Sequence, residues 1–267
     1  MSQYYKPDRG SRWNYGGESW KLSRSKISLF LECPRCFYID NKLGTKRPPG
    51  FPFNLNSAVD ALLKKEFDTH RADKTQHSIM KEYNIDAVPF NDDRMDAWRD
   101  ALKRGVEYTH PETGFPMSGA VDDIWVRPNG ELIVVDYKAT SKDGKITELD
   151  QDWHIGYKRQ LEVYQWLLRK NGFKVSNTSY WVYANAETNK KGFDRKLEFE
   201  LTLVPYEGDD SWVEGTLLDI KKALDSDLLP AAASDCDYCT YRETVGKKLM
   251  AFAGKAKKDG GQKSLGI

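Results

Sequence analysis

The stretch "GAVDDIWVRPNGELIVVDYKATS", residues 119–141, decides the fold. Two β-rich runs flank a Pro-Asn-Gly turn, a combination that is typical of a β-hairpin. On the second run, Asp136 and Lys138 are two residues apart and therefore point to the same face of the strand. The register of the hairpin sets Asp122 or Asp123 opposite or diagonal to Asp136. The sequence thus predicts two carboxylates and a lysine at one spot.

Two carboxylates this close repel each other unless a cation neutralises them. A hard divalent ion with oxygen ligands, Mg²⁺ or Mn²⁺, is the expected cation. Such an ion would polarise a phosphodiester and lower the pKa of a bound water, while Lys138 places or deprotonates that water. The alternative for a D-x-K pattern is a solvated strand end with an Asp136–Lys138 ion pair, worth about 0–1 kcal/mol.

The segments "GAVD" and "IVVDYKAT" resemble the paired signature of the PD-(D/E)XK nuclease superfamily, in its RecB-like branch. The resemblance implies that Asp122 and Asp136 hold the metal and that Lys138 is the catalytic lysine. A Q-x-x-x-Y motif also matches, and it implies that Gln160 and Tyr164, which share a helix face, orient the substrate. We expect an α/β restriction-endonuclease-like core, in which helices flank a central mixed sheet and the N-terminal part is helical.

One position departs from the RecB-like pattern. The helix before the hairpin often carries a histidine followed by an acid, whereas "NSAVDALL" has Val59 before Asp60. Asp60 is a candidate metal ligand, although an acid on a helix surface is more often simply solvated. His70 lies about three turns further along the same helix, too far to substitute. If nothing replaces the histidine, the alternative function is a catalytically inactive nucleic-acid-binding or adaptor protein.

All four cysteines fall into two C-x-x-C pairs, "CPRC" at 33–36 and "CDYC" at 236–239. Each pair places two thiolates on one turn, which is half of a four-thiolate metal site. Some RecB-like nucleases enclose a [4Fe-4S] cluster with one cysteine before the core and three after it. That family resemblance favours a [4Fe-4S] cluster, which is the cofactor we expect, whereas the symmetric two-and-two arrangement favours Zn²⁺, which is the alternative. The predicted ligands, which would join the two ends of the domain, are Cys33, Cys36, Cys236 and Cys239.

Composition and charge predict three parts. The chain has 41 basic and 40 acidic side chains among 267 residues, an ordinary globular balance. We expect a basic and aromatic N-terminal arm at 1–25, the nuclease-like domain at 26–245 and a flexible basic tail at 246–267. Two interpretations are open for the arm: its aromatic side chains stack on nucleic acid, or they dock on their own domain. We also expect a helix around 92–108 and core packing for Trp153.

The predicted function is a deoxyribonuclease that depends on Mg²⁺ or Mn²⁺ and acts in DNA repair, recombination or defence. The expected partner is DNA that is single-stranded or has free ends. The resemblance leaves room for a protein partner such as a helicase, for which the sequence carries no signal. No apolar run approaches the ~20 residues of a membrane span, and no secretory signal is visible. We therefore expect a cytoplasmic protein with no membrane partner.

Overall fold

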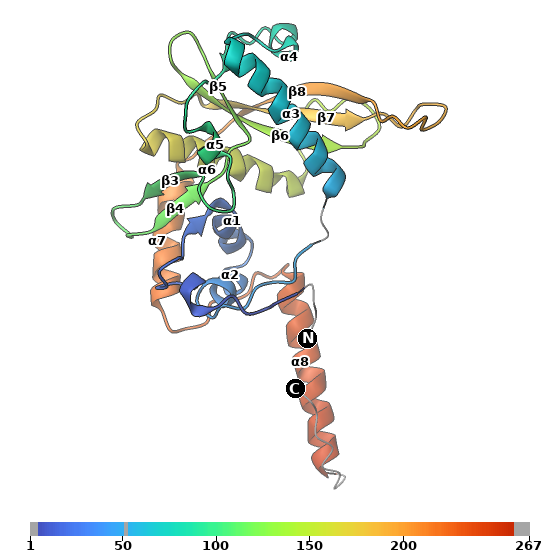
Figure 1. Cartoon of the computed structure of the whole chain (residues 1–267). Helices are drawn as coiled ribbons and strands as arrows, with labels where there is room; N and C mark the ends of the chain where they lie inside the picture. The colour runs from blue at the N-terminus through green and yellow to red at the C-terminus, as the bar shows by residue number, and fades with distance from the viewer. Residues whose placement is uncertain (1–4, 51–52, 259–267) are drawn as a thin grey trace. The chain divides into compact units, whose positions relative to one another are not determined.

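The computed structural model describes residues 5–50 and 53–258. They divide into two compact units (Figure 1). Among the described residues, the first unit combines 5–20, Lys26–Pro49 and 220–258, and the second combines Lys21–Ser25 with residue 50 and 53–219. The predicted α/β class is confirmed, because helices flank two mixed sheets.

The second unit contains a five-stranded mixed sheet in the order β2-β5-β6-β7-β8. β6 and β7 are parallel, and the other neighbours are antiparallel. A parallel pair needs a crossover connection, which the helix α6 (Ile155–Lys170) supplies after a short 3-10 helix, Asp152–His154. The strands are β2 (Val88–Pro89), β5 (Asp123–Val126), β6 (Leu132–Thr140), β7 (Thr178–Ala186) and β8 (Phe199–Glu207).

Helices cover both faces of this sheet (Figure 1). On one face lies α3 (Asn54–Asp73), whose Phe67 packs in a buried cluster with Val135 and Tyr137 of β6. Asp136, which lies between those two residues, accepts a hydrogen bond from the side-chain amide of Gln160 of α6. Successive residues of a strand point to opposite faces, so Val135 and Tyr137 meet α3, whereas Asp136 meets α6.

A smaller sheet of the second unit has the order β1-β4-β3, with β1 at Leu22–Ser23, β3 at Val106–Thr109 and β4 at Pro116–Gly119. Our prediction of a helix around 92–108 is wrong over most of that range. Only α5 (Met95–Trp98) is helical, and Val106 begins β3. The helix ends at Trp98, Gly105 adopts a φ of +93° just before β3, and pairing of β3 with β4 overrides the local helical preference. The remaining short helix is α4 (Ser78–Glu82).

The first unit contains α2 (Pro34–Asn41) and α8 (Asp237–Lys258), while α1 (Arg24–Glu32) and α7 (Trp212–Asp225) each belong partly to it. The indole of Trp20 is buried and donates to Asn41 at 3.1 Å. The Tyr15 hydroxyl donates to Asp225 at 2.7 Å. These contacts fit the interpretation that aromatic residues of the arm dock on their own domain.

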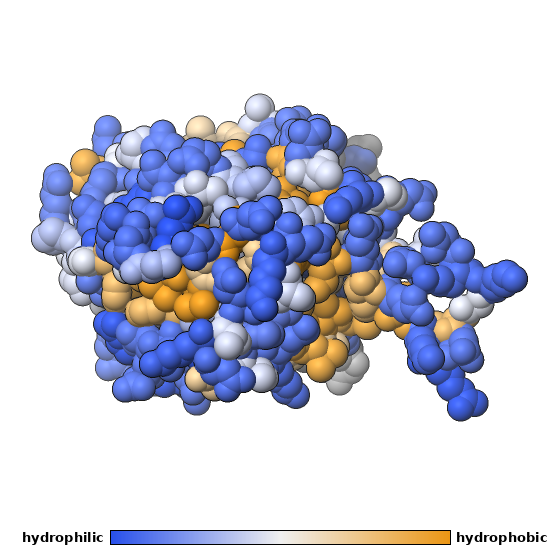
Figure 2. Space-filling view, turned by 90° about the horizontal axis from the view of Figure 1, so that it is seen from above, coloured by the Kyte–Doolittle hydropathy of each residue, from blue (hydrophilic) through white to orange (hydrophobic). Residues whose placement is uncertain are grey.

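The predicted tail at 246–267 begins inside α8, which is helical as far as Lys258. Residues 1–4 of the arm and 259–267 of the tail lie outside the described residues. Within 5–50 and 53–258, no helix has both the length and the apolar character needed to cross a bilayer. Figure 2 shows a face covered mostly by hydrophilic residues, with apolar residues visible in its hollows.

Candidate active site and candidate metal centre

The register of the β5–β6 hairpin decides which aspartate faces Asp136. Asp123 pairs with Val135, so Asp122, one residue before β5, lies across from Asp136. The carboxylate of Asp122 accepts a 3.1 Å hydrogen bond from the backbone N–H of Tyr137. Of the two aspartates that the sequence left open, Asp122 is therefore the one beside Asp136 and Lys138.

Asp123 lies in a different, buried network. Its side chain is fully buried and accepts a 2.6 Å hydrogen bond from the Tyr137 hydroxyl. It also pairs with Arg71, and Arg99 donates to it at 3.3 Å. Arg99 in addition donates to the backbone carbonyl of Asp122 at 2.9 Å, which fixes the chain at that residue. Asp123 thus supports the hairpin from its core side.

The D-x-K and Q-x-x-x-Y motifs meet at Asp136. Its carboxylate is fully buried, accepts a 2.7 Å hydrogen bond from the Gln160 amide and pairs with Lys138. The same amide lies 3.2 Å from the hydroxyl of Tyr164, one helical turn further along α6. A Cβ atom on Gly119 would lie 2.9 Å from the Tyr164 ring, so the glycine of "GAVD" is what lets α6 approach β4 so closely.

Burial and charge set the ionisation of this group. Burial raises the pKa of Asp136 to about 7, against the attraction of Lys138 and with the repulsion of Asp122. Burial also acts to raise the pKa of Asp122, but Lys64 and Lys138 outweigh it and hold that pKa below its usual value. Burial acts to lower the pKa of Lys138, but Asp136 and Asp122 raise it overall. Without a metal, Lys138 is therefore an ammonium ion.

A cavity of about 450 Å³ lies in front of these groups, lined in part by Asp60, Asp122 and Lys138. Aromatic side chains form much of the rest of its lining: Phe53, Trp153, Tyr157 and Tyr183. The core packing that we expected for Trp153 is wrong, because its side chain is 59% exposed. In the described part of the chain, no histidine lines the cavity. The site thus combines carboxylates and an ammonium with open aromatic surface.

Lys64 is the site residue that the sequence did not reveal. Its ammonium lies 2.9 Å from an oxygen of Asp60 and 3.0 Å from an oxygen of Asp122. The i, i+4 spacing of Asp60 and Lys64 on α3 was a signal for the first contact. The second contact depends on how α3 packs against the hairpin, which no local pattern encodes.

The donor set of the cavity fits a hard divalent cation. Asp122 lies across from Asp136 in the hairpin, and its charge contributes to the raised pKa of Asp136. They offer only oxygen ligands, which Mg²⁺ and Mn²⁺ prefer. A bound cation would also relieve the repulsion that raises the pKa of Asp136.

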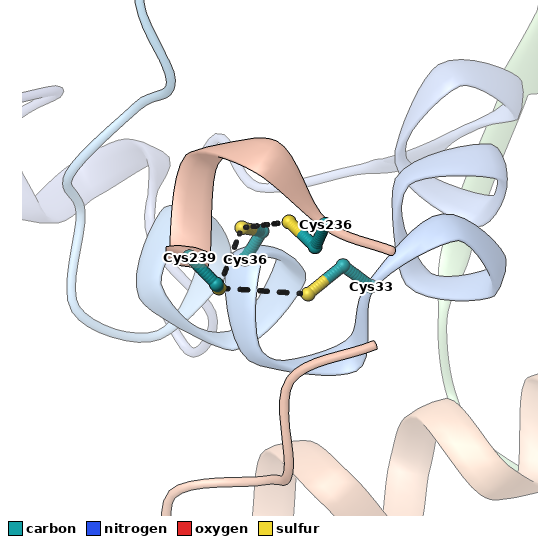
Figure 3. A group of neighbouring side chains, drawn as sticks. All are labelled: Cys33, Cys36, Cys236 and Cys239. Atoms are coloured by element: carbon teal, nitrogen blue, oxygen red, sulfur yellow. Dashed lines mark hydrogen bonds between the residues drawn. The ribbon is translucent and has the colours of Figure 1, made fainter. Parts of the chain in front are cut away.

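The four cysteines meet within the first unit (Figure 3). Cys33 and Cys36 lie at the start of α2, and Cys236 and Cys239 lie at the start of α8. All four are buried, and their sulfur atoms lie within 4.8 Å of one another. The predicted cluster of four thiols therefore forms from the two ends of the chain and is able to hold a metal ion.

The sulfur distances test which metal fits. They are 3.5 Å for Cys36–Cys239, 3.6 Å for Cys36–Cys236 and 3.8 Å for Cys33–Cys239. Four thiolates around one zinc ion, each at about 2.3 Å in a tetrahedron, lie about 3.8 Å apart. In a [4Fe-4S] cluster each thiolate binds a different iron, which places the sulfur atoms farther apart. All four sulfur atoms of Cys33, Cys36, Cys236 and Cys239 lie within 4.8 Å of one another, so they are able to bind a metal ion together.

A comparison with protein-family models agrees with these motifs. A family model described as "PD-(D/E)XK nuclease superfamily" matches residues 21–244, a range that includes the hairpin, α6 and both cysteine pairs. A comparison with curated proteins gives no match. A solved structure described as "Crystal structure of SSO0001" aligns at 13% sequence identity with a TM-score of 0.34, covering 77% of this chain and 75% of that chain.

Proposed function

Because the chain belongs to the PD-(D/E)XK nuclease superfamily, we propose that it is a deoxyribonuclease dependent on Mg²⁺ or Mn²⁺. One observation carries the proposal: the buried Asp136 receives both the Gln160 amide and the Lys138 ammonium, beside Asp122. The alternative for a D-x-K pattern is an ion pair on a solvated strand end. Such a pair would not be fully buried, and its carboxylate would not accept a hydrogen bond from a second motif, as Asp136 does from Gln160.

Each residue has a role that follows from its contacts. Asp122 and Asp136 would hold the divalent ion, and Gln160 fixes the orientation of the Asp136 carboxylate. A bound ion would supply charge stabilisation at the phosphodiester and would acidify a water. Lys138 would orient the attacking water, and it would be able to take a proton from it if the neighbouring carboxylates were neutralised and no longer raised its pKa. Tyr164 supports Gln160 from the next turn.

The lining of the cavity favours single-stranded DNA or free ends over continuous duplex. Phe53 is 75% exposed and Trp153 is 59% exposed, and both line the cavity that contains Asp122. Exposed aromatic faces stack on unpaired bases, an interaction worth about 1–3 kcal/mol per base. Bases of an intact duplex are already stacked and do not reach such a surface.

We further propose that the reaction belongs to DNA repair, recombination or defence, the processes in which free ends and single strands arise. A helicase partner would supply such strands from duplex DNA. Both statements rest on the proposed substrate.

We propose that the four cysteines bind one structural Zn²⁺ ion, which is the second of the two metals that the sequence left open. Three of the six sulfur separations, at 3.5–3.8 Å, support it. Arg47 lies 3.5 Å from the sulfur of Cys236, and its positive charge would offset part of the charge of four thiolates.

Cleavage assays test the nuclease proposal. Purified protein is mixed with end-labelled single-stranded and duplex DNA of the same sequence, with Mg²⁺, with Mn²⁺ or with neither. We expect cleavage only with a divalent ion, and faster cleavage of the single strand. DNA binding without cleavage under every condition would instead support the adaptor function.

A further inference from the structure

Lys64 occupies an unusual position for a surface-helix lysine. Its side chain is 24% exposed, and its ammonium bridges Asp60 on its own helix and Asp122 on the hairpin. Both carboxylates line the cavity of the proposed active site. The ammonium is therefore a cation that the chain itself places between two candidate metal ligands.

The two contacts use the oxygen atoms that a metal ion would need. One carboxylate oxygen of Asp122 accepts a hydrogen bond from the Lys64 ammonium, and the other accepts one from the backbone N–H of Tyr137. One carboxylate oxygen of Asp60 also accepts a hydrogen bond from the Lys64 ammonium. A divalent ion bound by Asp122 would share this space with a positive charge about 3 Å from the same carboxylate, and like charges so close repel.

We propose that Lys64 is an internal counter-cation that competes with the divalent ion for Asp122 and keeps Asp60 out of the ion's ligand set. It is a positioning residue, and the inference rests on the proposed function of the same site. In the absence of metal it neutralises part of the acidic cluster. In the presence of metal it lowers affinity and restricts the protein ligands to Asp122 and Asp136.

A purely structural role for Lys64 predicts the opposite effect on metal affinity. If the lysine only ties α3 to the hairpin, its removal loosens the carboxylates and weakens metal binding. If it competes with the ion, its removal strengthens binding. The direction of the change therefore separates the two roles.

The test is direct Mn²⁺ binding, followed by the electron paramagnetic resonance signal of free Mn²⁺ on the full chain with its cysteine site intact. We expect Lys64→Met to bind Mn²⁺ about tenfold more tightly than wild type, as the loss of one adjacent like charge implies. The matched control is Lys65→Met, the exposed neighbour on α3, which should bind as wild type does. Unchanged or weaker binding by a folded Lys64→Met protein would overturn the inference.

Two further variants keep the test decisive. Lys64→Gln removes the charge and retains a hydrogen-bond donor, so it should also tighten binding if Lys64→Met does not fold. Adding Asp60→Asn to the neutral variant should cancel part of the gain, because Asp60 becomes a ligand only when Lys64 is absent. If the wild type shows no Mn²⁺ site that Asp136→Ala abolishes, the proposed function fails instead of this inference.

Discussion

The backbone N–H of Tyr137 donates a 3.1 Å hydrogen bond to the carboxylate of Asp122. Tyr137 lies between Asp136 and Lys138, so this bond joins the two halves of the hairpin motif at its functional end. Its hydroxyl bonds Asp123 on the core side of the sheet at 2.6 Å. Tyr137 thus binds both Asp122, which directly precedes β5, and Asp123, the first residue of β5. It holds Asp122 beside the candidate active site and Asp123 in the buried core.

The Asp122→Asn variant removes the charge of this carboxylate but is able to keep its hydrogen bond to the backbone of Tyr137. The amide oxygen is still able to accept from Tyr137, but the variant offers no carboxylate to a metal. We expect single-turnover cleavage to fall at least about 100-fold, since even residues behind metal ligands cost 10–100-fold when lost. The melting temperature should change little. Cleavage within a few-fold of wild type would show that Asp122 is not a ligand.

Asp136→Asn should stabilise the protein at neutral pH when Mg²⁺ and Mn²⁺ are absent. Burial raises the pKa of Asp136 to about 7, whereas an aspartate in the unfolded chain has a pKa of about 4. Between these values the folded chain binds the extra proton, so stability is lost as the pH rises through the window. The asparagine variant cannot lose that proton.

Urea unfolding at several pH values measures the effect. Relative to wild type, Asp136→Asn should gain stability from about pH 4 to about pH 7 and keep a constant advantage above it. Asp123→Asn is the contrasting control, because it removes a buried charge paired with Arg71 and Arg99 and should destabilise throughout. A pH-independent difference for Asp136→Asn would contradict the raised pKa.

Trp153→Ala tests the proposed stacking surface. Losing one stacked base contact should raise KM for single-stranded DNA about tenfold and leave kcat nearly unchanged. Leu102→Ala is the control, because Leu102 is 94% exposed and does not line the cavity. Equal KM values for the two variants would rule out Trp153 as a base-binding residue.

Metal analysis tests the cysteine site. Protein purified without oxygen should be colourless and contain one zinc ion per chain, and Cys36→Ser should lose the zinc. Since structural zinc contributes directly to folding, we expect the variant to melt roughly 10 °C lower or more. Ser234→Ala, an exposed neighbour of Cys236, should match wild type. A brown protein with iron and sulfide would establish the cluster instead.

Local sequence patterns predicted the parts of the fold that depend on near neighbours. Strand alternation placed Asp136 and Lys138 together, and the spacing of Gln160 and Tyr164 set both on one face of α6. The pairing of β3 could not be predicted in this way, because Val106 joins a strand that a helical pattern precedes. To decide which of Asp122 and Asp123 faces Asp136, the β5–β6 strand register is required. The turn sequence alone left that register open by one residue.

Long-range contacts account for the other differences. Lys64 reaches Asp122 across 58 residues of sequence, and nothing near Lys64 encodes that contact. Trp153 sits in a periodic, apolar segment, yet it lines an open cavity. The four cysteines were predictable as a group, because two pairs with the same C-x-x-C spacing and no cysteine left over are typical of a four-thiolate metal site.

If Asp136 holds a catalytic divalent ion, its removal should abolish cleavage. Single-turnover cleavage of single-stranded DNA with Mn²⁺ is measured for wild type, Asp136→Ala and the control Asp96→Ala, an exposed aspartate on α5. We predict that the wild type and Asp96→Ala cleave at the same rate and that Asp136→Ala does not cleave measurably. Cleavage by Asp136→Ala at the wild-type rate would contradict the account.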